Sequence, residues 1–374
     1  MDFTYSEQQA MLRDSVDRFL AQRYDLARRK ALMDDAPAAE ALWRDMAELG
    51  WIGAAFSEAE GGFASSAIDA FAVMEGFGQR LVALPYLTSV ILCGGLLRHA
   101  SGSADLISLM IDGRLHVALA ACGETLLHSP QHGAVTATKA GSGYVLTGRL
   151  SVVLGADRAH KLLMAARTAG AEGERHGVTL FLVDTADVSR RNYRMIDGHG
   201  AAEVTVENLT VGADNMVGAL DGAAPLIEAA IDRATVMACG EAVGAMGYLI
   251  PTTAAYIRNR EQYGAPLAKF QVLQHRMADA FIASETARSM ALVAAIGLDG
   301  VPDPAAVSSA KFQVGRSARQ VAYQAVQLHG GMGVSEAMDI SHHYIRLTMI
   351  DRLFGDQAFH LRRYADLTQL GVSA

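Results

Sequence analysis

The sequence has few cysteines: Cys93, Cys122 and Cys239 are the only three among 374 residues. An odd number of thiols without the spacing of metal ligands gives no case for a metal site. Disulfides are rare in reducing compartments, so we expect a reduced, cytoplasmic protein. Each cysteine is expected to be a small core residue.

An excess of positive charge is also absent, since the formal net charge is -8 and the isoelectric point is about 5.8. Nucleic acids and anionic membrane surfaces attract basic proteins, so neither is expected as a partner. The first residues, MDFTYSEQQ, are acidic and polar, and no run approaches eighteen consecutive apolar residues. The sequence therefore predicts neither a signal peptide nor a membrane span.

The first part of the chain, residues 1–115, has the periodicity of helices. After Ser6, a plausible cap with Gln9 three residues later, one apolar helical face comprises Met11, Leu12, Val16, Phe19 and Leu20. Further helices are expected through AEALWRDMAELG and over 66–80, 85–99 and 104–112. The basic run of Arg23, Arg28, Arg29 and Lys30 is expected to be a solvated helix end. This part is predicted to be a helical bundle.

From Leu115 the pattern changes to short runs rich in valine, threonine and leucine. These runs are VALAA, AVTAT, YVLTG, SVVLG, KLLMAA, VTLFLVD and EVTVENLTV. They predict a small β-sheet or β-barrel domain over residues 116–218. Helical periodicity returns over 219–374, with helices to about Arg258, over 271–297, over 304–329 and near the C-terminus. The fold class is mainly α with a central β domain, and the last part is a four-helix bundle.

Two stretches in the last helical part carry chemistry. The first is YIRNREQYGAPLAKFQ, from Tyr256 to Gln271, in which Gly264 and Pro266 are expected to close a helix. Arg258, Arg260 and Gln262 recur there every two residues. A guanidinium offers forked donors to an anion, so this run suits a surface that meets phosphate, although a solvated helix end is the plain alternative.

The second stretch is AVQLHGGMG, where a long apolar helix reaches paired glycines that allow close approach of a backbone to a ligand. Together the two stretches resemble the acyl-CoA dehydrogenase family, and the resemblance covers nearly the whole chain. The motif residues are Tyr256, Arg260, Gln262, Tyr263, Gly264, Pro266, Phe270, Gln271, Gln327, Gly330, Gly331 and Gly333.

The resemblance implies FAD as the cofactor and an acyl-CoA thioester as the substrate. The residues that would hold the ADP half of FAD, in the flavin site of the neighbouring subunit, are Arg260, Gln262, Tyr263, Phe270, Gln271, Gln327, Gly330 and Gly331. Electron-transfer flavoprotein is the implied electron acceptor, and a dimer or tetramer is the implied assembly.

The family's reaction removes an α-hydrogen as a proton and passes a β-hydrogen to the flavin as hydride, so a positioned base is needed. The family's usual glutamate position is Phe354 in this chain, and the position that a minority of members use is Ala234. Neither can accept a proton. Glu241 and Asp356 are weak candidates, and a helix surface charge is the commoner explanation for each. Glu241 has apolar neighbours, so if it is buried it must be protonated or paired.

The platform for the flavin ring is also altered. The family's Thr-Glu-Pro region reads LAACGETLLHSPQHG here. In the segment after Gly148, Ser151 stands in place of an aromatic residue and Val153 in place of a hydroxyl residue. Asp232 and Arg233 match a family helix that lines the acyl channel, but they could equally form a surface pair.

These losses suggest one subunit of a heteromeric acyl-CoA dehydrogenase, in which a related chain supplies the base and the ring pocket. Heteromeric family members are associated with bulky acyl-CoA substrates such as steroid side chains. Three alternatives are a homo-oligomeric enzyme with an unconventional base, a non-enzymatic family member, and a flavin oxidase or monooxygenase. The adjacent His342 and His343 point to different helix faces, so a structural role is expected rather than metal binding.

Overall fold

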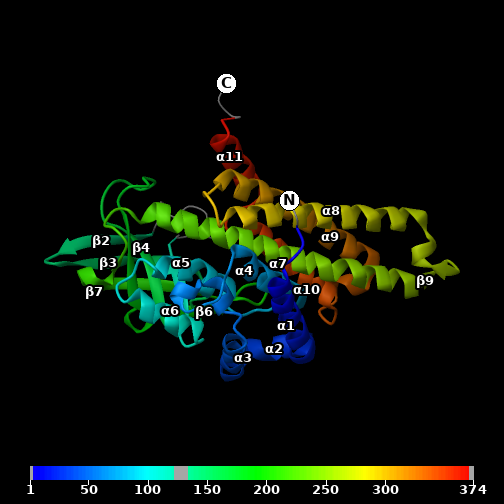
Figure 1. The fold of residues 1–374 in the computed structure, drawn as a ribbon, viewed down its shortest axis with the longest axis horizontal. Coiled ribbons are helices and arrows are strands. Elements are labelled where there is room, and N and C mark those ends of the chain that lie inside the picture. The colour runs from blue at the N-terminus through cyan, green and yellow to red at the C-terminus, as the bar shows by residue number, and fades with distance from the viewer. Residues whose placement is uncertain (1–2, 122–133, 370–374) are drawn as a thin grey trace. The chain divides into compact units, whose positions relative to one another are not determined.

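The computed structural model describes residues 3–121 and 134–369. The chain divides into two compact units. The first comprises Met1–Asp34, Ser66–Val82 and Thr235–Ala374, and the second comprises Asp35–Ser65 and Ala83–Ala234. One long helix, α7 (Ala223–Asn259), runs through the boundary at Ala234 (Figure 1).

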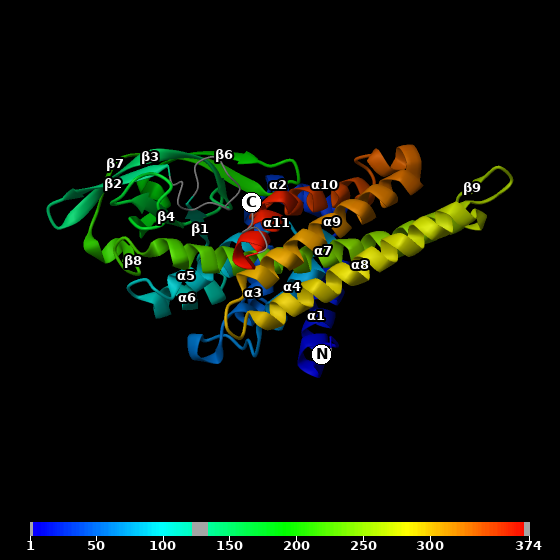
Figure 2. The ribbon, with the colours of Figure 1, turned by 90° about the horizontal axis from the view of Figure 1, so that it is seen from above.

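The first unit is helical. Besides the later part of α7, its helices are α1 (Glu7–Arg23), α2 (Leu26–Asp34), α4 (Ala67–Arg80), α8 (Gln271–Gly297), α9 (Pro304–His329), α10 (Asp339–Arg352) and α11 (Gln357–Leu367). Helix α9 packs against α8, α10 and α11, and Figure 2 shows α8 and α9 running side by side. The ranges of α8 and α9 match those expected from the sequence.

Helix α1 begins with the predicted capping box. The Ser6 side chain accepts a hydrogen bond from the Gln9 amide, and the Gln9 side chain accepts one from the Ser6 amide. Val16 and Leu20 of the predicted apolar face are buried. The prediction is wrong for Met11, which is 66% exposed.

The basic run after α1 is not a solvated helix end throughout. The structure contains the short helix α2 there, and Arg29 on it is only 4% exposed. Its Nε atom donates a hydrogen bond to the carbonyl oxygen of Leu81 at 2.9 Å. Leu81 ends α4 in a left-handed conformation, which leaves its carbonyl without a helical partner. The charged side chain is therefore buried because it completes the end of another helix.

Helices α4 and α7 touch through their backbones. A Cβ atom added to Gly78 would lie 1.8 Å from the Glu241 carbonyl oxygen, and one added to Gly244 would lie 1.8 Å from the Glu75 carbonyl oxygen. The contact is reciprocal, since each glycine faces the backbone of a glutamate on the other helix. Only a residue without a side chain permits this approach.

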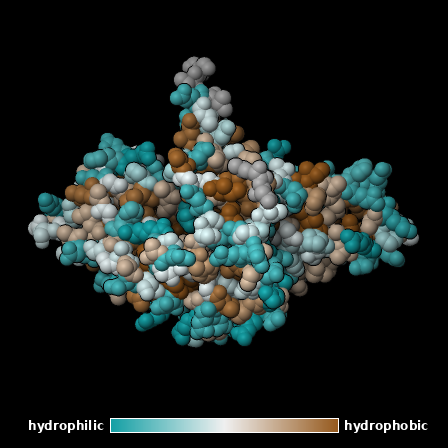
Figure 3. Space-filling view, in the orientation of Figure 1, coloured by the Kyte–Doolittle hydropathy of each residue, from teal (hydrophilic) through white to brown (hydrophobic). Residues whose placement is uncertain are grey.

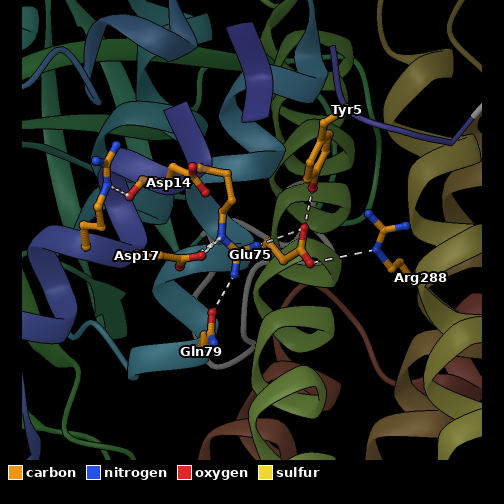
Figure 4. Close-up of polar contacts among 8 residues, drawn as sticks. Tyr5, Asp14, Asp17, Glu75, Gln79 and Arg288 are labelled. Atoms are coloured by element: carbon orange, nitrogen blue, oxygen red, sulfur yellow. Dashed lines mark hydrogen bonds and ion pairs between the residues drawn. The ribbon is translucent and has the colours of Figure 1, made fainter. Parts of the chain in front are cut away.

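The side chain of Glu75 joins three more segments to this crossing. Its carboxylate accepts a hydrogen bond from the Tyr5 hydroxyl and pairs with Arg13 Nη1 at 3.2 Å and with Arg288 Nε at 3.9 Å. Figure 4 shows Tyr5 and Arg288 pointing toward Glu75 from different segments. The N-terminal segment, α1 and α8 are thereby attached to α4.

The second unit combines helices with a mixed sheet. Its helical segments are α3 (Ala36–Glu48), the π-helix Tyr86–Cys93, α5 (Gly94–Leu97) and α6 (Ser103–Ile111). Its strands are β1 (Val117–Ala120), β2 (Val135–Ala140), β3 (Gly143–Leu154), β4 (Lys161–Arg167), β5 (Val178–Asp184), β6 (Ser189–Arg194), β7 (Gly200–Val211) and β8 (Met216–Val217). A single helix had been expected over 85–99, and the structure divides it. The runs YVLTG and SVVLG form one strand, β3.

The strand order in the sheet is β6-β7-β3-β2-β4-β5-β8, and β1 pairs with β4. Strand β4 pairs in parallel with β1 and β2, and the remaining pairs are antiparallel. Apolar side chains from most strands form one buried cluster, which includes Leu146, Leu162 and Phe181. The predicted class, mainly α with a central β domain, is confirmed as a mixed sheet between helical regions of the sequence.

By length and composition alone, α7 and α8 are apolar enough to cross a membrane, which the count of consecutive apolar residues did not indicate. In α7, 78% of the apolar window is buried inside the protein, as in the core helix of a globular domain. In α8 the buried share is 39%, so this helix carries apolar surface that the chain itself leaves uncovered.

We expect Gly244→Ala to lower the free energy of unfolding by about 2 kcal/mol or more, because its methyl group would overlap the Glu75 carbonyl. Gly247→Ala is the matched control. It lies one turn further along α7, with no atom within 4 Å of an added Cβ. That change should be neutral or should stabilise the helix by up to about 1 kcal/mol. Urea denaturation of both variants measures the difference, and equal stabilities would contradict the close helix contact.

Candidate functional site

The first motif stretch forms the end of α7 and a two-stranded hairpin. The helix ends at Asn259, and β9 (Glu261–Gln262) pairs with β10 (Ala265–Pro266). The turn residues Tyr263 and Gly264 have φ angles of 53° and 77°, which is typical of a two-residue type I′ turn. The prediction that Gly264 and Pro266 close the helix is therefore wrong, because these residues shape the hairpin after it. The hairpin lies at the tip of α7 and α8 (Figures 1 and 2).

The predicted ADP-binding side chains of this stretch are turned away from the core. Arg260, Gln262 and Gln271 are exposed, and Phe270 is half-buried. Tyr263 is 93% exposed, and its ring meets the edge of the Phe270 ring at a centroid distance of 6.2 Å. A large aromatic side chain held this far out of the fold is available to a molecule outside the chain.

The second motif stretch is the end of α9. The Gly330 amide donates a hydrogen bond to the Gln327 carbonyl oxygen and ends the helix. Gly330 has φ 60° and ψ -140°, a conformation that side chains disfavour. A Cβ atom added to Gly330 or Gly331 would meet no atom within 4 Å, so the space beside them is open. Exposed backbone at such a position can approach a phosphate or ribose closely.

The two stretches meet in the structure. Tyr256, on the last turn of α7, stacks against His329, the last residue of α9, with ring centroids 4.2 Å apart. Arg260 and Gln262 thus belong to the same region of the bundle as Gln327, Gly330 and Gly331. Tyr256 belongs to the sequence motif, but the contact between the two rings was not predicted.

The usual position of the base is occupied by Phe354, which is 1% exposed and has a left-handed φ of 61°. Two buried side chains hold the turn around it. Lys311 Nζ donates hydrogen bonds to the carbonyl oxygens of Asp351 at 3.0 Å and Gly355 at 2.8 Å, and His360 Nε2 lies 3.0 Å from the Phe354 carbonyl oxygen. Ala234, the alternative base position, is fully buried on α7. Neither position offers a proton acceptor.

Glu241 is buried and paired, which is one of the two states expected for a buried carboxylate. Its Oε1 atom accepts from Arg346 Nε at 2.6 Å and its Oε2 atom from Arg346 Nη2 at 2.7 Å. The side chains of both residues are at most 4% exposed. A forked pair of this kind occupies both carboxylate oxygens, so Glu241 has the geometry of a structural ion pair between α7 and α10.

The other charged candidates have ordinary surroundings. Asp356 caps α11 by accepting from the Phe359 amide at 2.9 Å, and this bond holds the pKa of its carboxyl below the usual value. Asp232 and Arg233 are half-buried on α7. Among the described residues, no group of three or more histidine, cysteine, aspartate or glutamate side chains could hold a metal ion.

The strand that would face the flavin ring is apolar at the decisive position. Val153 is fully buried within the sheet core, and Ser151 is exposed. The pairing of β3 with β7 shifts register between Leu150 and Val153, and Tyr193 donates a hydrogen bond to the Ser151 carbonyl oxygen at 2.8 Å. Most of the LAACGETLLHSPQHG segment, residues 122–133, lies outside the described residues.

Comparison with known proteins identifies the family. The acyl-CoA dehydrogenase N-terminal domain matches residues 6–104, and the acyl-CoA dehydrogenase C-terminal domain matches residues 222–366. The chain belongs to the acyl-CoA dehydrogenase family. Its relatives include acyl-CoA dehydrogenase FadE27 of Mycobacterium tuberculosis, which is 28% identical over 341 residues covering 86% of each chain.

Two solved structures show how much of this chain has the acyl-CoA dehydrogenase fold. A chain of the ChsE4-ChsE5 complex from Mycobacterium tuberculosis is 25% identical, with a TM-score of 0.87 over 100% of both chains. PigA, solved with FAD and proline, shares the fold at 20% identity, with a TM-score of 0.88 over 99% of this chain and 100% of that chain. The acyl-CoA dehydrogenase fold thus covers the whole chain.

Members of the acyl-CoA dehydrogenase family are FAD flavoproteins. The exposed Arg260 and Gln262 and the open backbone at Gly330 and Gly331 fit the charged, hydrogen-bonding ADP half of that cofactor. The described part of the ring platform fits less well, because Val153 has no hydroxyl and its side chain is directed into the sheet core. The two halves of the expected site are therefore unequally preserved.

Glu241→Gln should lower the free energy of unfolding by about 3–5 kcal/mol, because it leaves the Arg346 guanidinium buried without its counter-charge. Replacing both residues by methionine removes the uncompensated charge and should cost less than the single change. Denaturant titration compares the two variants. A Glu241→Gln protein as stable as the wild type would contradict the structural role of the pair.

Acid should destabilise the protein through two buried histidines. Burial, assisted by the nearby Lys311 ammonium, lowers the pKa of His360 to about 3, and burial lowers the pKa of His343 to about 4. A histidine in an unfolded chain has a pKa of about 6.5. The unfolded state therefore binds more protons below about pH 6.5, and stability should fall from there toward pH 4, by up to about 1.4 kcal/mol per pH unit for each residue.

Replacing His360 by glutamine should reduce this slope, whereas His275→Gln on the exposed surface of α8 should leave it unchanged. Denaturant titrations between pH 5 and pH 7 measure both slopes. An unaltered slope in the His360 variant would count against the buried neutral imidazole.

Proposed function

We propose that this chain is one subunit of a heteromeric, FAD-dependent acyl-CoA dehydrogenase that catalyses α,β-dehydrogenation of an acyl-CoA thioester. The observation that carries the proposal is the contrast between two regions of the site. The hairpin and glycine turn expected to meet ADP are open and exposed, whereas a buried phenylalanine occupies the position of the base. A symmetric homodimer would repeat the missing base in both sites.

Surface properties of the first unit support a partner subunit. Helix α8 follows the exposed hairpin after one short 3-10 turn, and it carries exposed apolar side chains, among them Val272, Phe281 and Ile282. Figure 3 shows hydrophobic surface over the region of α8. Exposed apolar surface of this kind marks protein interfaces, and a related chain of the same fold is the occupant that would also complete the flavin site.

In this assembly, the motif residues of this chain would bind only the ADP half of FAD. Arg260 would bind phosphate, and Gln262, Gln271 and Gln327 would donate or accept hydrogen bonds around the ADP half of FAD. When bound, FAD supplies the hydride acceptor for the reaction. The related chain would supply the carboxylate that takes the α-proton and the wall against the flavin ring.

We further propose electron-transfer flavoprotein as the electron acceptor and the cytoplasm as the location. A bulky, ring-bearing acyl group is the proposed substrate, and Asp232 and Arg233 of α7 are proposed to line its channel. A homo-oligomeric enzyme would need another base. Both carboxylate oxygens of Glu241 are bound by Arg346, however, and the carboxylate of Asp356 caps a helix. These contacts favour the heteromer over that alternative.

The decisive experiment purifies the chain alone and after co-expression with the product of a paralogous neighbouring gene. We expect the lone chain to lack stoichiometric flavin absorbance and turnover, and the two-chain assembly to contain FAD and to oxidise acyl-CoA. Full FAD occupancy and full activity of the lone chain would overturn the heteromer. An assembly without flavin would favour a non-enzymatic partner, and oxygen consumption by its reduced flavin would indicate an oxidase.

Arg260→Ala in the assembly should weaken FAD binding about tenfold or more, since a charged hydrogen bond contributes about 1.5–3 kcal/mol. Arg44→Ala is the control, because Arg44 is also exposed but lies on α3, outside both motif stretches. Equal FAD affinities of the two variants would show that Arg260 does not bind FAD.

A further inference from the structure

Tyr256 and His329 form a contact between segments that are 73 residues apart in the sequence. Their rings stack with a centroid distance of 4.2 Å and an interplanar angle of 27°. The Tyr256 hydroxyl also donates a hydrogen bond to the His329 carbonyl oxygen at 3.4 Å. The tyrosine is half-buried and the histidine is buried, so the contact lies beneath exposed residues of both motif stretches.

Each ring is attached to one of the segments expected to face the nucleotide. The Tyr256 carbonyl oxygen accepts the Arg260 amide at 2.9 Å, and the Arg260 carbonyl oxygen accepts the Leu267 amide at 2.8 Å across the base of the hairpin. His329 directly precedes Gly330, and its Nδ1 atom lies 2.7 Å from the Ala325 carbonyl oxygen within α9. A movement of either ring would therefore be passed to its segment.

The hydrogen bonds and the charge of His329 indicate that its ring acts through stacking on Tyr256. Nδ1 donates to the Ala325 carbonyl oxygen, and Nε2 is a buried atom without a hydrogen-bond partner among the described residues. Burial lowers the pKa of the imidazole, so the ring is neutral near pH 7. Two neutral aromatic rings in contact attract each other through dispersion and their quadrupoles.

We propose that Tyr256 and His329 are positioning residues, whose stacked rings set the distance between the hairpin at 260–266 and the glycine turn at 327–333. This inference rests on the proposed function in so far as these two segments hold the ADP half of FAD. The ring contact carries the role, and the tyrosine hydroxyl is secondary.

The test uses the two-chain assembly and FAD as the probe. Tyr256→Leu and His329→Leu should each raise the dissociation constant of FAD about threefold to tenfold, and the double variant should be no weaker than the worse single one. Tyr256→Phe keeps the ring and should bind FAD as the wild type does. All measurements are made well below the unfolding temperature of the least stable variant.

A second measurement on the lone full-length chain separates this inference from the proposed function. Hydrogen exchange at the amides of 330–334 should be faster in Tyr256→Leu than in the wild type and in Tyr256→Phe, although that substitution lies on another helix. If no assembly binds FAD, the proposed function fails and the exchange rates alone decide the coupling. Unchanged exchange, or Leu variants that lose thermal stability and keep wild-type FAD affinity, would overturn the positioning role.

Discussion

The reciprocal glycine contact between α4 and α7 is the constraint on which the first unit depends. Gly78 and Gly244 bring two helix backbones together, and the contact places Glu75 and Glu241 beside the same crossing. Glu75 then attaches the N-terminal segment, α1 and α8, while Glu241 attaches α10 through Arg346. The hairpin that ends α7 is held on a helix fixed by these contacts, which gives an exposed element a rigid base.

The two regions of the candidate site differ in which groups are buried and which are exposed. At the hairpin and glycine turn, polar side chains and backbone are exposed, and the buried contact beneath them is a pair of stacked rings. At the Phe354 turn the arrangement is reversed, because an apolar residue is enclosed while Lys311 and His360 satisfy the carbonyl oxygens around it. These contacts hold the turn, and position 354 offers no group for acid–base chemistry.

Much of this fold could be predicted because its signals are local. Helices α8 and α9 begin and end where the sequence indicated. In α9 the limits are marked locally, since Asp303 and Pro304 start the helix and Gly330 ends it. Strand β6 was missed because SRRNYR is an exposed edge strand without apolar alternation. The burial of Arg29 was also missed, because its partner carbonyl is supplied by Leu81 of another segment.

In the candidate site, too, local motifs could be predicted from the sequence, whereas tertiary partners could not. The motif stretches were visible in the sequence. The commoner explanation for Glu241, a helix surface charge, is wrong, whereas the alternative of a buried carboxylate that must be protonated or paired is confirmed. Arg346 lies 105 positions away, so no local pattern could identify it as that partner. The stacking of Tyr256 on His329 is likewise a tertiary contact.

The two-residue turn at the tip of the hairpin has a geometric consequence for any chain that binds there. Strands β9 and β10 pair over two residues each, so the projection has a fixed reach. Successive strand residues point to opposite faces, and a one-residue insertion would exchange the faces of Gln262 and its neighbour. In the proposed heteromer, the surface of the related chain would therefore have to fit both the depth of this projection and the alternation of its side chains.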